Sequence, residues 1–277
     1  MTINKVALIT GSGTGVGAAS ALALAARGWH VVIHYARSEA EARASQAACD
    51  AAAAQGAETL LLQGDVAQDA DCRALVAATA KRWGRIDALV NNAGVTSFAG
   101  AANWDAVDAE TFQHIVGVNA LGSFQMIRAA APQLKAAAGS VVNVSSIAGA
   151  LGIGSSVAYI ASKGALNAMT LYFARALAPE VRVNAVCPGL ITTRWFVDGL
   201  GQEAFDKVKA SYEKRAPLGR ACSADDVAEA VVWLVDGART MTGELLMLDG
   251  GMHLGAQGGV TIPGRGCATD APDAPDA

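Results

Sequence analysis

The chain has 277 residues, 52% of them hydrophobic and 17% charged, and a formal net charge of −4 at pH 7. This length and composition suit one large α/β domain or two small ones, and the absence of a basic run argues against nucleic acid as a partner. The five cysteines form no Cys-x-x-Cys or Cys/His group, and no stretch approaches 18 uninterrupted apolar residues. We therefore expect a cytoplasmic protein with free thiols, no metal site and no membrane partner.

The first predicted elements are a strand, a glycine turn and a helix. Residues 6–10 form a short apolar run typical of a buried parallel strand, and a small-residue helix follows the glycines. The glycine spacing is Gly-x-x-x-Gly-x-Gly rather than the usual Gly-x-Gly-x-x-Gly. This arrangement directs backbone N–H groups and a helix N-terminus at a phosphate. The residues expected to bind the nucleotide here are Gly11, Ser12, Gly13, Thr14, Gly15, Val16 and Gly17.

Residues 29–35 form the second predicted strand, and the residues after it indicate which dinucleotide is bound. An acidic residue at this point would favour NAD(H) by bonding the 2′-hydroxyl of the adenine ribose, and none is present. Arg37 and Ser38 offer donors suited to a 2′-phosphate. Arg37 could instead be a solvated loop residue, and Ser38 with Glu41 matches a capping box for the next helix. We favour NADP(H) over NAD(H).

Helices and strands alternate along the rest of the chain. Further helices are predicted at about 39–54, 69–84, 109–134, 157–179 and 224–235, and further strands at about 59–63, 86–90, 140–144, 181–186 and 244–248. With right-handed crossovers, this order predicts a single domain over residues 1–254, built on a doubly wound, seven-stranded parallel sheet of Rossmann type.

Two segments differ from this alternation. Residues 190–217 carry Trp195, Phe196, Phe205 and Tyr212, and we interpret them as an apolar flap over a substrate pocket rather than as core. A helical lid and a plain surface helix are both compatible with this pattern. Residues 255–277 are dominated by Gly, Pro, Ala and Asp, which predicts a flexible tail.

A tyrosine and a lysine one helical turn apart form a candidate acid–base pair. Tyr159 and Lys163 are predicted on one face of the helix at 157–179. A phenol with its ordinary pKa near 10 is a poor acid or base at neutral pH, and a fixed ammonium beside it would favour the phenolate. Ser146 is expected at the end of the preceding strand, where its hydroxyl and the phenol could converge on one carbonyl oxygen.

Together these motifs resemble the short-chain dehydrogenase/reductase family over about residues 3–254. Ser146 precedes Tyr159 by 13 residues, which is the usual interval in that family. The motifs that carry the resemblance are Thr10-Gly11-x-x-x-Gly15-x-Gly17, Asp65-Val66, Asn91-Asn92-Ala93-Gly94, Asn119, Ser146, Tyr159-x-x-x-Lys163 and Pro188-Gly189.

The resemblance implies catalytic roles for four residues. Tyr159 would be the general acid in reduction and the general base in oxidation. Lys163 would lower the pKa of Tyr159 and bond the nicotinamide ribose. Ser146 would donate a hydrogen bond to the substrate carbonyl, and Asn119 would hold a water that links Lys163 to solvent.

The resemblance also implies contacts to the cofactor and substrate. Asp65 would meet the adenine, Asn91 the ribose beside it, and Ile191 the carboxamide through its backbone, with Thr193 nearby. Trp195 is expected to face the substrate. The other motif residues implied to bind the cofactor are Val66, Asn92, Ala93, Gly94, Pro188 and Gly189.

Comparison within the family narrows the substrate class. Residues 34–38 resemble the pteridine reductases, which use NADP(H), but those enzymes usually carry Asp in place of Ser146 and a basic residue in place of Thr14. The 3-oxoacyl-carrier-protein reductases are a near match, yet only Lys135 stands where they tend to have a basic cluster. We therefore expect a ketone or 3-oxoacyl reductase acting on a small carbonyl or alcohol, with acyl-carrier protein left open but not favoured.

The resemblance further implies a homotetramer paired through the helices of Asn119 and Tyr159. Two alternatives remain: a non-catalytic NADP(H)-binding regulatory protein, and an NAD(H)-dependent alcohol dehydrogenase of the same fold. The identity of the substrate, its stereochemistry and the physiological direction are not predicted.

Overall fold

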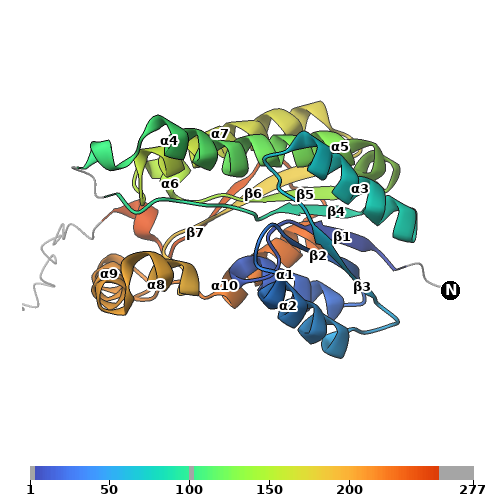
Figure 1. Ribbon diagram of the computed structural model, residues 1–277, viewed down its shortest axis with the longest axis horizontal. Helices are drawn as coiled ribbons and strands as arrows, with labels where there is room; N and C mark the ends of the chain where they lie inside the picture. The colour runs from blue at the N-terminus through green and yellow to red at the C-terminus, as the bar shows by residue number, and fades with distance from the viewer. Residues whose placement is uncertain (1–3, 100–102, 256–277) are drawn as a thin grey trace, which may run out of the picture.

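Seven parallel strands form one sheet, in the order β3-β2-β1-β4-β5-β6-β7, in the computed structural model, which describes residues 4–99 and 103–255 (Figure 1). The order reverses between β1 and β4, which creates the crevice where open α/β sheets bind ligands. The doubly wound, seven-stranded sheet is therefore confirmed, whereas the predicted tail lies outside the described residues except for Gly255. The strands are β1 Val6–Ile9, β2 His30–Tyr35, β3 Thr59–Gln63, β4 Ala88–Asn91, β5 Ser140–Val144, β6 Arg182–Pro188 and β7 Leu245–Leu248.

Helices cover both faces of the sheet, as Figure 1 shows. On one face lie α1 (Gly15–Ala25), α2 (Glu39–Ala52) and α10 (Ala224–Val232), the last continued by a π-helical turn at Trp233–Gly237. On the other lie α3 (Asp69–Trp83), α4 (Ala109–Val116), α5 (Gly122–Ala136) and α7 (Val157–Ala176). Short elements are α6 (Ala148–Leu151) and two 3-10 turns, Trp104–Ala106 and Met252–Leu254.

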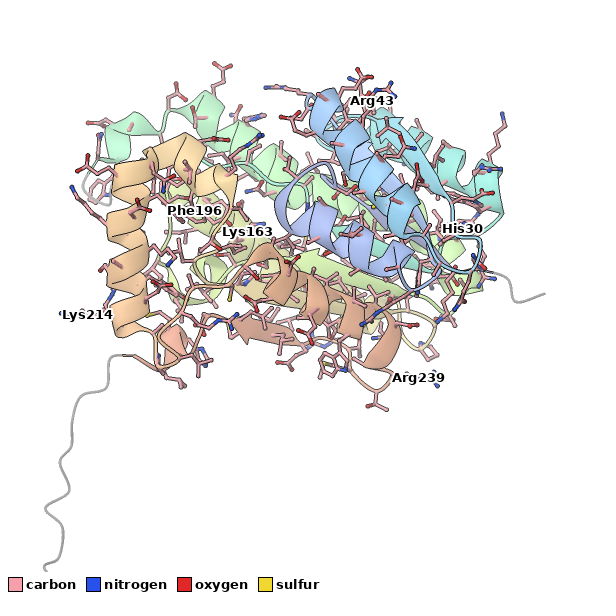
Figure 2. The ribbon with its side chains drawn as sticks, turned by 90° about the horizontal axis from the view of Figure 1, so that it is seen from below. His30, Arg43, Lys163, Phe196, Lys214 and Arg239 are labelled. Atoms are coloured by element: carbon pink, nitrogen blue, oxygen red, sulfur yellow. The ribbon has the colours of Figure 1, made fainter. Side chains whose placement is uncertain are left out.

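The predicted flap forms two helices, α8 (Arg194–Leu200) and α9 (Gln202–Arg215), beside the carboxyl ends of the strands (Figures 1 and 2). The interpretation of its aromatic residues is wrong for two of them. Phe205 and Tyr212 are each 6% exposed and pack with Leu190 and Ala216 in a small core of their own. The flap is thus a folded part of the domain with a small core of its own, and its first helix, α8, faces the crevice.

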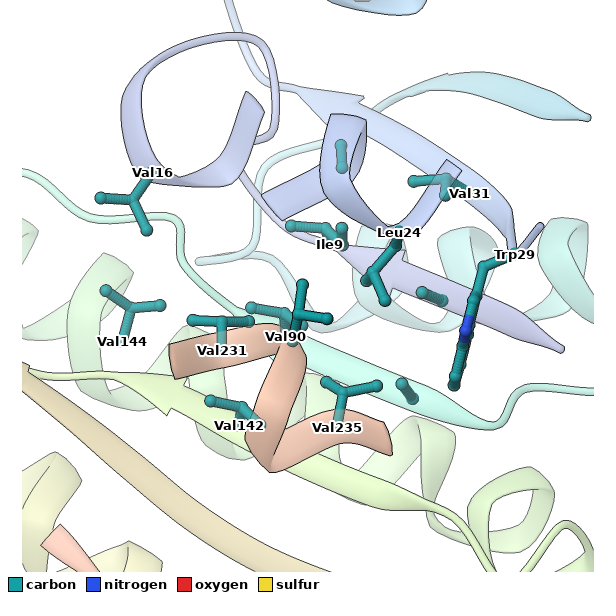
Figure 3. Close-up of a cluster of buried hydrophobic side chains, with 14 of the residues drawn as sticks. Ile9, Val16, Leu24, Trp29, Val31, Val90, Val142, Val144, Val231 and Val235 are labelled. Atoms are coloured by element: carbon teal, nitrogen blue, oxygen red, sulfur yellow. The ribbon is translucent and has the colours of Figure 1, made fainter. Parts of the chain in front are cut away.

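The main core lies between the sheet and α1 and α10 (Figure 3). Ile9, Val90 and Val142 come from three adjacent strands and meet Leu24 and Val231 from the helices. Leu8, one residue before Ile9, faces the opposite core under α3 and α5, because side chains alternate along a strand. Strands buried on both faces read as continuous apolar runs, which is why β1 was recognisable in the sequence.

Three local predictions differ from the structure. The helix expected at 109–134 is two α-helices joined by a π-helical turn, Gly117–Leu121, that contains Asn119. The expected capping box at Ser38 and Glu41 does not form, because Ser38 has φ −87° and ψ 67° and its side chain makes no cap hydrogen bond. The sixth strand continues through Pro188 instead of ending before it.

Candidate active site and cofactor cleft

The glycine turn between β1 and α1 is bent at positions that favour glycine. Gly11 and Gly15 have φ of +63° and +55°, and a Cβ on Gly17 would lie 2.4 Å from Nδ2 of Asn92. The first N–H groups of α1 have no partner within the helix, and Thr14 at the N-cap does not bond them through its side chain. These donors are therefore available to an anion.

A cavity of about 460 Å³ extends from this turn across the carboxyl ends of the strands. Its size lies within the usual range for small-molecule and cofactor sites. Glycine turn, helix N-terminus and volume together fit a dinucleotide. The predicted residues that line the cavity are Gly11, Gly13, Thr14, Gly15, Val16, Arg37, Ser38, Asp65, Val66, Asn92, Ala93, Gly94, Ile191, Thr193 and Trp195.

Besides Tyr159 and Lys163, five residues predicted to bind the cofactor do not line the cavity: Ser12, Gly17, Asn91, Pro188 and Gly189. The hydroxyl of Ser12 donates to the carbonyl of Ile9 at 2.8 Å and accepts from the backbone N–H of His34 at 2.8 Å. The amide of Asn91 donates to Oδ1 of Asn143 at 2.9 Å instead of pointing toward a ribose. These side chains support the turn and the sheet edge, and cofactor binding by Ser12 and Asn91 stays a prediction.

His34 is a cavity residue that the sequence analysis missed. Its Nδ1 accepts from the N–H of Gly11 at 2.9 Å, so its Nε2 carries the proton and donates to the carbonyl of Gly64 at 3.0 Å. Burial lowers the pKa of His34 to about 4. A neutral imidazole therefore ties the glycine turn to the end of β3. A polar residue within an apolar strand was the available signal.

Several other lining residues were also not singled out from the sequence. They come from the end of β2, the segment after β4, α4 and the π-helical turn after it, the end of β5, and the start of the flap, where no motif marks them. They are Tyr35, Ala36, Val95, His114, Val118, Val144, Arg194 and Asp198.

Ser146, Tyr159 and Lys163 lie together at the inner end of this cleft. Tyr159 and Lys163 share one face of α7, whose first turn is capped by Ser156, and Nζ of Lys163 lies 5.6 Å from the centroid of the tyrosine ring. Ser146 follows β5, and its side chain is near enough to the phenol of Tyr159 to favour the phenolate. All three side chains are at least nine-tenths buried, and Figure 2 shows Lys163 in the interior.

These three residues do not line the cavity themselves but adjoin residues that do. Nζ of Lys163 donates to the carbonyl of Val144 at 2.8 Å. The ring of Trp195 meets that of Tyr159 edge to face, with the centroids 5.9 Å apart. Val144 and Trp195 both belong to the cavity wall. The acid–base group therefore stands one residue behind the cleft surface.

Burial shifts the pKa values of both Tyr159 and Lys163. Burial raises the pKa of Tyr159 to about 12, and the hydrogen bond from Ser146 opposes that rise. Burial also lowers the pKa of Lys163 to about 8. Lys163 is not among the groups that shift the tyrosine pKa, and its Nζ donates to the carbonyl of Val144 at 2.8 Å. At neutral pH the phenol is protonated and can donate.

Asn119 stands in the π-helical turn with its side chain fully occupied. Its Oδ1 accepts from the N–H of Val95 at 2.8 Å, and its Nδ2 donates to the carbonyl of Val95 at 3.0 Å and to Oγ of Ser162 at 2.9 Å. These bonds join the segment after β4 to α7, one residue from Lys163. The amide therefore fixes the relative position of the cleft wall and the catalytic helix.

Aromatic side chains connect the flap to this group. The rings of Trp195 and Phe196 lie 5.7 Å apart, and Phe196 meets Phe98 at 5.8 Å and Phe205 at 6.2 Å. A Cβ on Gly199 would lie 2.0 Å from the ring of Phe98, so α8 docks closely on the segment after β4. The cleft is therefore aromatic where Trp195 of the flap lines it.

Other kinds of site find no support in the part of the chain that the structure describes. Within residues 4–99 and 103–255, no group of three or more His, Cys, Asp or Glu side chains could hold a metal ion. Across the same ranges, no helix combines the length and apolarity needed to span a bilayer. Four free cysteines are described: Cys49, Cys72, Cys187 and Cys222.

The fold and the cleft define a dinucleotide-dependent oxidoreductase, and comparison with known proteins agrees. A family model described as enoyl-(acyl carrier protein) reductase matches residues 11–253. A protein described as ketoacyl reductase 2 of the granaticin polyketide synthase of Streptomyces violaceoruber is 42% identical, covering 90% of this chain and 96% of its own. The 3-oxoacyl-[acyl-carrier-protein] reductase of Staphylococcus aureus is 32% identical, covering 92% and 100%.

Solved structures are similarly close. Levodione reductase has a TM-score of 0.84 at 31% identity and covers 92% of this chain and 99% of its own. A Burkholderia xenovorans structure described as a short-chain dehydrogenase/reductase has a TM-score of 0.83 at 41% identity, covering 92% and 100%. The chain belongs to the short-chain dehydrogenase/reductase family. It is an oxidoreductase that acts on CH–OH groups with NAD(P)(H) as the cofactor class.

Proposed function

We propose that the protein is an NADP(H)-dependent oxidoreductase that interconverts a ketone or 3-oxoacyl group and a secondary alcohol, with Tyr159 as general acid and base. The observation that carries this proposal is the buried group of Ser146, Tyr159 and Lys163 behind a cleft that fits a dinucleotide. The likeness to proteins named as ketoacyl reductases supports the same reaction class.

Each catalytic residue has a role that follows from its surroundings. NADP(H), when bound, supplies or accepts the hydride, and the chain positions and polarises the carbonyl. In reduction, the protonated phenol of Tyr159 donates to the oxygen as negative charge develops, and Ser146 donates a second hydrogen bond to that oxygen. Lys163 would bond the nicotinamide ribose and hold positive charge beside Tyr159. Asn119 is bonded to Val95 in the segment after β4 and to Ser162, the residue before Lys163.

Replacing Tyr159 with Phe tests the acid–base assignment. General acid–base help is worth ~10²- to 10⁴-fold, so the variant should lose turnover by that order. Binding of the reduced cofactor, followed by its fluorescence, should remain. The matched control is Tyr172→Phe on the same helix, whose ring is 64% exposed and lies outside the cleft lining. Near-normal turnover by Tyr159→Phe would show that another group moves the proton.

The preference for NADP(H) rests on the end of β2. Arg37 and Ser38 line the cavity, and Ser38 is not engaged as a helix cap, so both remain able to bond a 2′-phosphate. Charge-assisted bonds of this kind are the stronger class of hydrogen bond. Arg37→Ala should weaken NADPH binding by about tenfold or more and leave NADH binding unchanged. Equal NADPH affinity in wild type and variant would contradict a phosphate contact at Arg37.

The proposed partners are a small carbonyl or alcohol substrate and further copies of this chain in a homotetramer in the cytoplasm. Trp195 lines the cavity, Phe196 packs against Trp195 and Phe98 against Phe196, and this aromatic group favours a substrate with an apolar body. An acyl-carrier protein is not favoured, because Lys135 near the end of α5 has no basic neighbours in sequence. A panel of ketones, alcohols and acyl thioesters, read by absorbance of the reduced cofactor, ranks these substrates.

A further inference from the structure

Arg194, the first residue of α8, lies where the flap crosses the cofactor cleft. It lines the cavity together with its neighbours Thr193 and Trp195. A Cβ on Gly15 would lie 3.8 Å from Cγ2 of Thr193, so the start of α8 stands over the glycine turn and the N-terminus of α1. The flap thus carries Arg194 beside the glycine turn, where the first backbone N–H groups of α1 are available to an anion.

The partners of Arg194 join the two sides of the cleft. Its Nη2 lies 3.1 Å from Oε1 of Glu41 on α2, and its Nε lies 3.1 Å from Oδ2 of Asp198 on the next turn of α8. The glycine turn packs against α2 next to this bridge, because a Cβ on Gly13 would lie 3.3 Å from Ala42, the residue after Glu41. The side chain is 64% exposed, so its contacts are exchangeable.

Two arginines line the cavity, Arg37 and Arg194. Arg37 stands at the end of β2, where a 2′-phosphate is expected. The glycine turn itself contributes Thr14 and no cation. A dinucleotide phosphate carries a second anionic group, the pyrophosphate, and a planar guanidinium fork suits two phosphate oxygens at once.

We propose that Arg194 binds the pyrophosphate of the cofactor from the flap side, opposite the N-terminus of α1, exchanging Glu41 for the phosphate oxygens. This inference rests on the proposed function, because it requires a dinucleotide in the cleft. It gives the flap a direct hold on the cofactor through the same helix that carries Trp195, whose ring meets that of Tyr159.

Cofactor binding to the whole chain tests the inference. Dissociation constants for NADPH and for NADH are measured by cofactor fluorescence in wild type, Arg194→Ala, Arg43→Ala and Glu41→Gln. Arg43 is the matched control: it is also 64% exposed and ion-paired to a glutamate, but it lies outside the cleft lining at the edge of the molecule (Figure 2). Glu41→Gln removes the bridge and keeps the guanidinium.

Arg194→Ala is expected to weaken NADPH and NADH binding by the same factor, about tenfold, because both carry the pyrophosphate. Arg43→Ala should bind both as wild type does, and Glu41→Gln should bind both at least as tightly, because it frees the guanidinium of Arg194 from a competing carboxylate. Unchanged binding by Arg194→Ala overturns the inference, as does a loss confined to NADPH, which would assign Arg194 to the 2′-phosphate. An equal loss in Glu41→Gln also overturns it, because the bridge would then be responsible. Wild type that binds neither cofactor would instead refute the proposed function.

Discussion

His34 lies under the glycine turn as a neutral imidazole with both ring nitrogens bonded to backbone. Burial lowers its pKa from 6.5 to about 4, although Asp65 and Asp71 oppose the shift. In the unfolded chain the imidazole takes up a proton near pH 6.5, so between pH 6.5 and 4 the unfolded state binds more protons than the folded one. Stability is therefore present above pH 6.5 and is lost as pH falls toward 4.

The expected loss from this residue is on the order of 3 kcal/mol between pH 7 and pH 4. Urea unfolding of wild type and His34→Gln across this range measures it. The variant should be less stable than wild type at pH 7, because it changes the hydrogen bonds that His34 makes to Gly11 and Gly64. Its stability should fall less steeply with acid, because glutamine does not titrate. Parallel curves for the two proteins would show that His34 does not titrate as its burial requires.

At the residue scale, the identity of the residues in the acid–base group was more predictable than their pKa values and hydrogen-bond partners. The sequence predicts Tyr159, Lys163 and Ser146 as a group, and the structure brings them together. It does not predict the pKa of Tyr159, because spacing along a helix says nothing about desolvation or about the carbonyl of Val144 that holds Lys163. Nor does it predict which way Asn91 turns, because that depends on Asn143 from a strand 52 positions away.

The strand, turn and helix at the N-terminus act as one element whose geometry depends on Gly17. A methyl group there would lie 2.4 Å from Asn92 Nδ2 and 2.5 Å from the carbonyl of Gly11. Gly17→Ala should cost about 1 to 3 kcal/mol of stability, as overpacking typically does, and should weaken cofactor binding because the turn must shift.

Gly117→Ala provides the control for that substitution. Gly117 is helical, and a Cβ there meets no atom within 4 Å in the chain. This variant should be neutral or more stable by roughly 0.5 to 1 kcal/mol, because alanine is the better helix former. Thermal unfolding of both variants and cofactor titration provide the measurements. Equal destabilisation by the two alanines would refute the close approach at Gly17.

Element boundaries were predictable wherever local chemistry sets them. The helix that begins at Asp69 ends at Gly84 as expected, because Gly84 adopts the left-handed conformation with φ 75°. The break at Gly117–Leu121 was not predictable, since no proline interrupts residues 109–121. The π-helical turn instead accompanies the bonds from Asn119 to Val95 and Ser162, which exist only in the folded chain.

At the scale of the whole molecule, the predicted tetramer requires apolar surface on the paired helices. Leu121 beside α5 is 46% exposed, and Leu171 on α7 is 39% exposed. Leu171→Glu should shift the protein from four chains to fewer, because a buried charge at an interface is costly. Light scattering of the purified protein measures the mass. Leu218→Glu, at an exposed leucine after α9, should leave the assembly unchanged.

The two ends of the flap segment are pinned side by side. A parallel bridge joins Ile191 and Cys222, the N–H of Thr192 donates to Cys222 at 2.8 Å, and the N–H of Cys222 donates to Leu190 at 3.0 Å. Residues 192–221 therefore leave the sheet and return at almost one point, carrying Trp195 and Arg194 but none of the catalytic helix. Because its two ends meet at one point, this segment could be exchanged as one piece between relatives. We expect such an exchange to change the range of substrates and to leave the acid–base residues unaltered.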